Sequence, residues 1–141
     1  MIPDSLISST IRDISRHYLS FGTASDDVNL PAPAADRGYL LYLHIPFCVV
    51  LCPFCSFHRV EFRQPRAQAY FAALRREIRL ATDLGYRFTE LYVGGGTPTV
   101  MPDELLETVK LVRELHPMRR MSTETNPDDL GNDALKKLRE A

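Results

Sequence analysis

The segment YLLYLHIPFCVVLCPFC, residues 39–55, joins an apolar run of strand length to a loop that contains every cysteine of the chain. The run 39–45 is rich in leucine and tyrosine and predicts a strand. Pro46 ends that strand, because proline cannot donate a backbone hydrogen bond within a sheet. The three thiols therefore follow directly after the carboxyl end of a strand.

Strand-like and helix-like segments alternate after the cysteine loop. Segment 66–85 places Phe71, Leu74, Ile78 and Ala81 on one face of a helix, and Gly85 is typical of a helix end. The later elements are expected as a strand at 89–93, a helix from Pro102 to just before Pro117, a strand at 120–125 and a helix from about Asp133. Strands alternating with helices in this way predict parallel βαβ units.

The predicted fold class is α/β, with three βα units and parallel strands. A parallel sheet of only three strands leaves faces and edges to be covered. We therefore expect the N-terminal part of a longer protein, with an isolated three-layer domain as the alternative. Residues 1–38 are expected to form an amphipathic helix at 4–20 and a linker, and residues 39–141 the core domain. The apolar face of that first helix would carry Ile7, Ile11, Ile14 and Tyr18.

Composition narrows the classes of function. The 141 residues are 45% hydrophobic and 25% charged, with a formal net charge of -1, which gives no indication of binding to nucleic acid. The longest apolar stretch, at about 40–52, is interrupted by His44 and Pro46 and is too short for a transmembrane helix. The N-terminus has no secretory signal pattern, and clustered cysteines without one predict a reducing, cytoplasmic location.

Cys48, Cys52 and Cys55 have the spacing C-x3-C-x2-C. Three thiolates on one short loop can each bind a different iron of a [4Fe–4S] cube, which leaves the fourth iron open to a small molecule. The alternative is a zinc site of three cysteines completed by His44 or His58. A redox disulfide is less favoured, because no C-x-x-C begins a helix in a thioredoxin-like context.

Two further motifs stand at the ends of later strands. GGGTPT, residues 94–99, follows the second strand, where glycines let a ligand approach exposed backbone groups. The Lys-Ser/Thr of a nucleotide-binding P-loop is absent from it. Glu124 ends the third strand in ETNP, which places a carboxylate at the same edge of the sheet.

The cysteine loop, with Phe54 before its third cysteine, resembles the signature of the radical S-adenosylmethionine superfamily. Within that superfamily, the chain resembles the oxygen-independent coproporphyrinogen III oxidases and their heme-chaperone relatives over about residues 39–130. The motifs that carry this resemblance are YLHIPFC, CPFC, LYVGGGTPT and ETNP. The resemblance implies a partial (β/α)6 barrel, of which this chain would be the first half. It also implies a [4Fe–4S] cluster on the three cysteines, and the family members cleave S-adenosylmethionine reductively to start radical chemistry. The implied contacts to S-adenosylmethionine are Tyr42, Phe54, Gly95, Gly96, Thr97 and Glu124.

The resemblance implies an enzyme of porphyrin metabolism that takes its electron from a donor such as flavodoxin or ferredoxin. In the oxidases a further cysteine stands two residues after the third, where this chain has Phe57. The heme-chaperone relatives also lack that cysteine. A heme-trafficking protein with a non-catalytic cluster and a methylase of the same family are therefore alternative expectations. The substrate is expected to be a tetrapyrrole or another small molecule, and the isolated chain is expected to be poorly soluble and to be inactive if later strands carry essential contacts.

Overall fold

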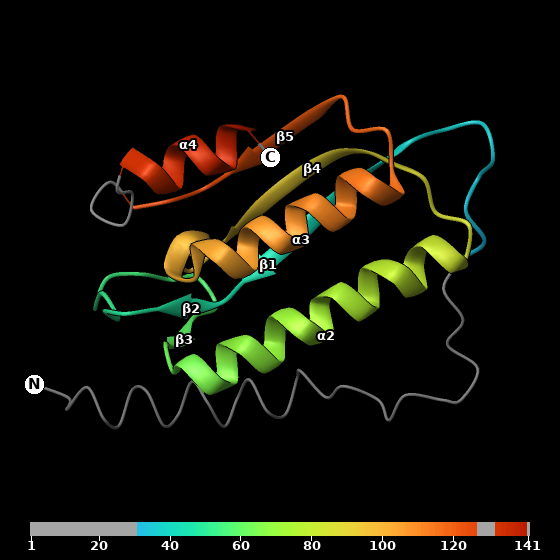
Figure 1. The fold of residues 1–141 in the computed structure, drawn as a ribbon. Helices are drawn as coiled ribbons and strands as arrows, with labels where there is room; N and C mark the ends of the chain where they lie inside the picture. Colours follow the sequence, from blue (N-terminus) through green and yellow to red (C-terminus); the bar gives the residue numbers. More distant parts are fainter. Residues whose placement is uncertain (1–30, 127–131, 141) are drawn as a thin grey trace, which may run out of the picture. The chain divides into compact units, whose positions relative to one another are not determined.

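The structure, a computed structural model, describes residues 31–126 and 132–140. The helix predicted at 4–20 and most of the linker lie outside these residues. Residues 32–141 form one compact unit, in which strands and helices alternate (Figure 1). Its elements are β1 Tyr39–Ile45, β2 Phe47–Cys48, β3 Val60–Glu61, α2 Gln64–Asp83, β4 Phe88–Gly95, the 3-10 turn η1 Pro98–Val100, α3 Pro102–Leu115, β5 Arg120–Thr123 and α4 Asn132–Glu140.

The main sheet has three parallel strands in the order β1-β4-β5. The α/β class and the parallel strands predicted from the sequence are therefore confirmed. Because β4 is central, its carboxyl end lies between those of β1 and β5, and the three loops that leave these ends are neighbours. Pairing of Tyr42 with Tyr92, and of Tyr92 with Ser122, fixes the register across the sheet.

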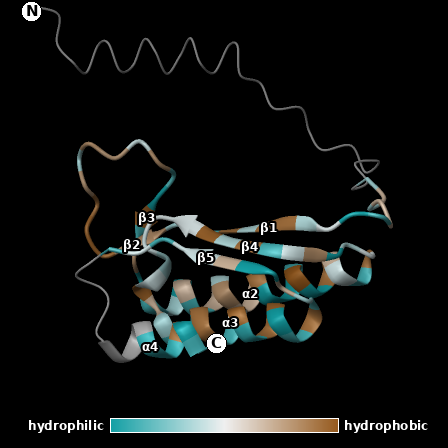
Figure 2. Ribbon diagram, turned by 90° about the horizontal axis from the view of Figure 1, so that it is seen from above, coloured by the Kyte–Doolittle hydropathy of each residue, from teal (hydrophilic) through white to brown (hydrophobic). Residues whose placement is uncertain are grey.

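The helices lie on one side of this sheet (Figure 2). Alternation along β1 turns Leu43 and Ile45 into the core, and Leu91 and Val93 of β4 join them. Helix α2 buries the predicted residues Phe71, Leu74 and Ile78 against them, and α3 buries Leu105, Val109 and Val112. Apolar side chains every three or four residues along each helix thus fix which face packs on the sheet.

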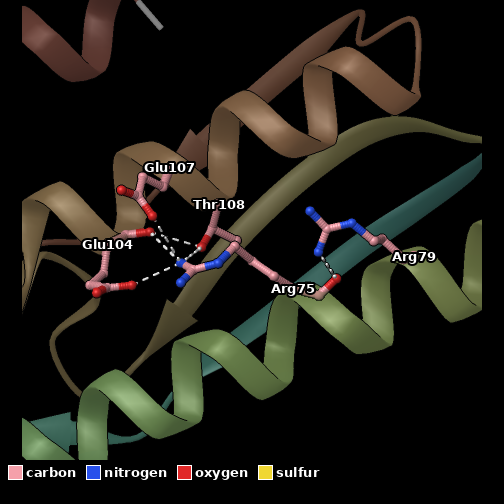
Figure 3. Close-up of polar contacts among 5 residues, drawn as sticks. All are labelled: Arg75, Arg79, Glu104, Glu107 and Thr108. Carbon is pink, nitrogen blue, oxygen red and sulfur yellow. Dashed lines mark hydrogen bonds and ion pairs between the residues drawn. The ribbon is translucent and has the colours of Figure 1, made fainter.

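The two long helices are joined by a polar contact at the edge of the core (Figure 3). Arg75 of α2 lies 2.8 Å from the carboxylate of Glu104 and 3.3 Å from the hydroxyl of Thr108, both on α3. Glu107 is a more distant partner, at 3.8 Å. The Arg75 side chain is 18% exposed, so this contact is sheltered from solvent.

The opposite side of the sheet carries the strand residues that alternate with the buried core residues. Leu40, Tyr42 and His44 of β1 and Tyr92 of β4 form this surface, called here the open face. Leu40 is 58% exposed and Tyr42 is 50% exposed. The described helices α2, α3 and α4 all lie on the other side of the sheet (Figure 2). The open face adjoins the carboxyl ends of the strands, where the candidate site lies.

Candidate functional site

A short ladder that the sequence pattern did not predict closes the cysteine loop. Strand β2 pairs in parallel with β3, so that Phe47 lies opposite Val60 and Cys48 opposite Glu61. The N–H of Val60 donates to the carbonyl of Pro46 at 2.7 Å, and that of Phe62 donates to the carbonyl of Cys48 at 2.9 Å. Both ends of loop 49–59 are thereby held together, with Cys52 and Cys55 in the loop and Cys48 in the strand that precedes it.

The three cysteines differ in burial. Cys48 is buried within β2, whereas Cys52 and Cys55 are half-buried in the loop, and all three thiols are free. The carbonyl of Cys52 accepts a hydrogen bond from the N–H of Cys55 at 3.2 Å and another from the guanidinium of Arg59. These two bonds stabilise the turn that separates the second and third cysteines.

The glycine run passes directly against the base of the cysteine loop. The N–H groups of Gly96 and Thr97 donate to the carbonyls of Ile45 and Phe47, each at 2.8 Å. A Cβ on Gly96 would lie 2.8 Å from the sulfur of Cys48, and Gly95 has φ +124° with a backbone oxygen 2.7 Å from its Cβ position. Both positions therefore require glycine, because a side chain would push the glycine run away from the first cysteine.

Threonine and asparagine side chains extend this contact to the end of β5. The hydroxyl of Thr97 donates to the sulfur of Cys48 at 3.6 Å and accepts from the amide nitrogen of Asn126 at 3.2 Å. The hydroxyls of Thr99 and Thr125 are 2.7 Å apart. Loops that follow β1, β4 and β5 are thus joined by side chains near the sulfur of Cys48.

Glu124 is held at this edge by its backbone and by both carboxylate oxygens. Its N–H donates to the carbonyl of Val93 at 2.9 Å. Oε2 accepts from the N–H of Gly95 at 3.2 Å, and Oε1 accepts from the hydroxyl of Tyr92 at 2.6 Å. The hydrogen bond to Glu124 is the main cause that raises the pKa of Tyr92, ahead of burial and of the nearby charge of Glu124.

A cleft of about 770 Å³ brings the predicted residues together. All of the predicted site residues except Tyr42 line it: Cys48, Cys52, Phe54, Cys55, Gly95, Gly96, Thr97 and Glu124. Four further residues line the cleft that sequence reasoning did not single out: Val49, Val50, Arg59 and Thr125. Asn126 also lines the cleft, and its position in ETNP was the signal that could have identified it.

Tyr42 lies beside the cleft on the open face. Its ring stacks on that of Tyr92, with centroids 6.0 Å apart, and its hydroxyl lies 3.0 Å from Nδ1 of His44. Nε2 of His44 lies 3.2 Å from the carbonyl of His58, so Nε2 carries the proton and Nδ1 accepts from Tyr42. Both ring nitrogens of His44 are therefore engaged away from a metal.

The donor set at the cleft, with three free thiols around one loop, is of the type that holds an iron–sulfur cluster. Among the residues that the structure describes, no three Cys, His, Asp or Glu side chains converge on one metal position. A cube spaces its thiolate ligands further apart, because each binds a different iron. Three free thiols, a glycine-lined wall and a carboxylate match a cluster with one iron open to a ligand.

Comparison with protein families then identifies the chain. The family description that matches residues 42–141 is that of the Radical SAM superfamily. The chain belongs to the radical SAM superfamily. The matched residues include the whole cleft, so the family assignment and the geometry rest on the same part of this radical SAM chain.

The chain is similar to relatives with three different names. It is 31% identical over 107 residues to the heme chaperone HemW of Bacillus subtilis, covering 71% of this chain and 28% of the relative. It is 36% identical over 111 residues to the oxygen-independent coproporphyrinogen III oxidase of Escherichia coli, covering 74% and 24%. Anaerobilin synthase of Escherichia coli O157:H7 is 36% identical over 90 residues, covering 60% and 20%.

A solved structure supports the same fold. The coproporphyrinogen III oxidase HemN from Escherichia coli, described as a radical SAM enzyme, matches with a TM-score of 0.68 and 35% identity. The match covers 76% of this chain and 26% of that one. The chain therefore has the fold of part of a radical SAM enzyme, and it spans about a quarter of the length of the relatives compared here. Within the described residues no helix is long and apolar enough to cross a membrane.

Proposed function

We propose that this chain holds a [4Fe–4S] cluster on Cys48, Cys52 and Cys55 and binds S-adenosylmethionine in the adjoining cleft. It would form the cofactor-binding part of a radical SAM oxidoreductase similar to oxygen-independent coproporphyrinogen III oxidase, acting on a tetrapyrrole. One observation carries the proposal: three free thiols, the glycine run and the carboxylate of Glu124 line one cleft at the carboxyl ends of parallel strands. The names and sequence similarity of the relatives support the choice of substrate class.

Each group in the cleft has a distinct part in this proposal. When bound, the cluster supplies the electron for reductive cleavage of S-adenosylmethionine. Gly95 and Gly96 bring the backbone of the glycine run close to Ile45 and Cys48 and line the cleft, and Glu124 would accept hydrogen bonds from donors of the ligand. Phe54, whose side chain is 88% exposed, offers an apolar surface at the rim of the cleft. Tyr42 would contact the ligand from the adjoining open face.

The thiols also bear on location and on the electron source. Three unpaired cysteines that must stay reduced favour the cytoplasm. A small redox protein such as flavodoxin or ferredoxin would supply the electron, because nothing in the cleft residues can store one. Cys55 and Cys52 are half-buried rather than fully buried, which leaves the loop accessible to such a donor.

Anaerobic reconstitution with iron and sulfide, followed by EPR of the reduced chain, tests this function. We expect a [4Fe–4S] signal that shifts when S-adenosylmethionine is added. Cys52→Ser should lose most of the signal, whereas Ser56→Ala, an exposed change in the same loop, should retain it. A cluster whose spectrum ignores S-adenosylmethionine, or a chain that takes up zinc and refuses iron, would contradict the proposal. Heme transfer to an apo-acceptor without cleavage of S-adenosylmethionine would indicate the heme-trafficking function instead.

A further inference from the structure

Glu124 has two hydrogen-bond donors on the central strand, one for each carboxylate oxygen. Oε1 accepts from the hydroxyl of Tyr92 at 2.6 Å, and Oε2 accepts from the N–H of Gly95 at 3.2 Å. The N–H of Gly95 is a backbone group, so this donor does not depend on a particular side chain. The hydroxyl donor depends on the choice of tyrosine at position 92, so this contact is specific to the side chain.

Gly94 makes the room in which this contact forms. A Cβ at Gly94 would lie 3.2 Å from Cδ and from Oε2 of Glu124, and 3.1 Å from Cε1 of Tyr92. The carboxylate, from the residue that follows β5, and the phenol ring, from β4, thus both lie over the missing side chain. Glu124 is exposed to solvent, and its contacts with Tyr92 and Gly95 hold its carboxylate over Gly94.

Tyr92 is itself held from the other side. Its ring stacks on Tyr42 of β1 at an interplanar angle of 23°. Tyr42 in turn donates to His44, whose second ring nitrogen contacts the carbonyl of His58 in the cysteine loop. The phenol of Tyr92 is therefore fixed by the sheet and its neighbours before any ligand enters the cleft.

We propose that Tyr92 is a positioning residue that fixes the carboxylate of Glu124 for S-adenosylmethionine. This inference rests on the proposed function, since it assumes that S-adenosylmethionine occupies the cleft that Glu124 lines. Each oxygen of the carboxylate keeps lone pairs that Tyr92 and Gly95 do not use. Those lone pairs can accept from the ammonium or hydroxyl groups of the ligand. Holding the carboxylate in advance lowers the conformational entropy lost on binding.

Equilibrium binding of S-adenosylmethionine to the reconstituted chain tests the inference. We expect Tyr92→Phe to weaken binding by about three- to tenfold, because it removes one partly exposed hydrogen bond to a charged group. Glu124→Ala should weaken binding more, and adding Tyr92→Phe to it should change nothing further, because the tyrosine acts through the carboxylate. Tyr39→Phe is the matched control: it removes a phenol hydroxyl from the far end of β1 and should leave binding unchanged.

Carbon-13 NMR of labelled tyrosine rings gives a second readout that needs neither cluster nor ligand. The Tyr92 resonance is identified by its loss in Tyr92→Phe, and it should titrate above the ordinary tyrosine range. Glu124→Ala should lower the pKa of Tyr92, since the hydrogen bond is the main cause of its rise. Unchanged binding in Tyr92→Phe, or an unchanged titration of Tyr92 in Glu124→Ala, would overturn the role of Tyr92 while leaving the proposed function in place. A wild-type chain that carries the cluster and binds no S-adenosylmethionine would overturn both.

Discussion

At the scale of single residues, the site depends on positions where a side chain is excluded. Gly96 packs its backbone against the sulfur of Cys48, and Gly95 combines a positive φ with a close approach to Ile45. Glycine is the residue that meets both conditions without strain. The absence of side chains at Gly95 and Gly96 thus sets how closely the glycine run approaches the first cysteine.

Gly96→Ala should therefore destabilise the chain by about 1–3 kcal/mol through overpacking and lower the iron bound per chain several-fold. Chemical denaturation and iron analysis after reconstitution measure the two effects. Gly85→Ala is the control, because Gly85 has a positive φ at which alanine is strained, but it lies after α2, far along the chain from the cysteines. It should lower stability and leave iron loading intact. Equal iron loading in Gly96→Ala and wild type would contradict the expected contact.

His116, after the end of α3, is buried in the neutral form. The hydroxyl of Thr82 donates to the carbonyl of Ile78 at 2.8 Å and lies 2.9 Å from Nε2 of His116, so Nε2 must donate to it. Nδ1 then accepts from the N–H of Phe88 at 3.5 Å. Burial lowers the pKa of His116, and a proton on Nδ1 would face the N–H of Phe88.

This histidine predicts a pH dependence of folding. Its pKa is lower in the folded chain than in the unfolded one, so the unfolded state binds more protons between the two values. The free energy of unfolding should be unaffected by His116 above about pH 6.5 and should fall as the pH drops below it. Denaturation at pH 5 and pH 7 should show a larger loss in wild type than in His116→Gln. An equal loss in both would show that other groups cause the pH dependence.

At the scale of elements, the pairing of α2 with α3 combines apolar packing with one charged contact. Arg75 is the residue of α2 that contacts Glu104 and Thr108 at once (Figure 3). With side chains 18% and 21% exposed, the Arg75–Glu104 pair is more sheltered than a surface ion pair. Removing the arginine leaves a half-buried carboxylate without its partner.

Arg75→Gln should therefore reduce the free energy of unfolding by roughly 1–2 kcal/mol, between the values typical of exposed and buried pairs. Arg79→Gln on the same helix is the control, because Arg79 is exposed and, among the residues that the structure describes, donates to the backbone carbonyl of Arg75. That change should have an effect within about 0.5 kcal/mol. Urea denaturation monitored by circular dichroism distinguishes the two variants, and equal effects would contradict the role given to the Arg75 contact.

At the scale of the whole compact unit, the sheet is covered on one side only within the described residues. The helices pack on one side, while Leu40, Tyr42 and Tyr92 of the open face are exposed. Parallel sheets are ordinarily buried on both faces, and unpaired strand edges favour association between chains. The poor solubility expected from the sequence remains a prediction, and the open face is the surface through which we expect chains to associate.

Leu40→Lys should reduce self-association, because it places a charge on the open face. Leu80→Lys is the matched control: Leu80 is also 58% exposed, but it lies on α2 rather than on the sheet. Sedimentation velocity over a range of concentrations should show a shift toward monomer for Leu40→Lys only. The same shift for both variants would indicate a general effect of added charge.

Much of this protein could be read from local pattern. The periodicity of apolar residues predicted β1, β4, α2 and α3, and Pro46, Gly85, Pro102 and Pro117 marked their ends within a few residues. Such signals are readable because they depend on one segment at a time. The ladder of β2 with β3 escaped this reading, since two residues show no period and their pairing depends on a loop that folds back on itself.

The sequence by itself determined the α/β class, the order of the elements and the three thiols on one short loop. Only the tertiary structure decided which side chains meet: Cys48 against Gly96, Glu124 between Tyr92 and Gly95, and His116 beneath Phe88. The physical reason is distance along the chain. The period of apolar residues within one segment determines which face of a helix or strand a residue occupies. Its neighbours across the sheet depend on strand register and on the helices that connect the strands, and both are established only when the core packs.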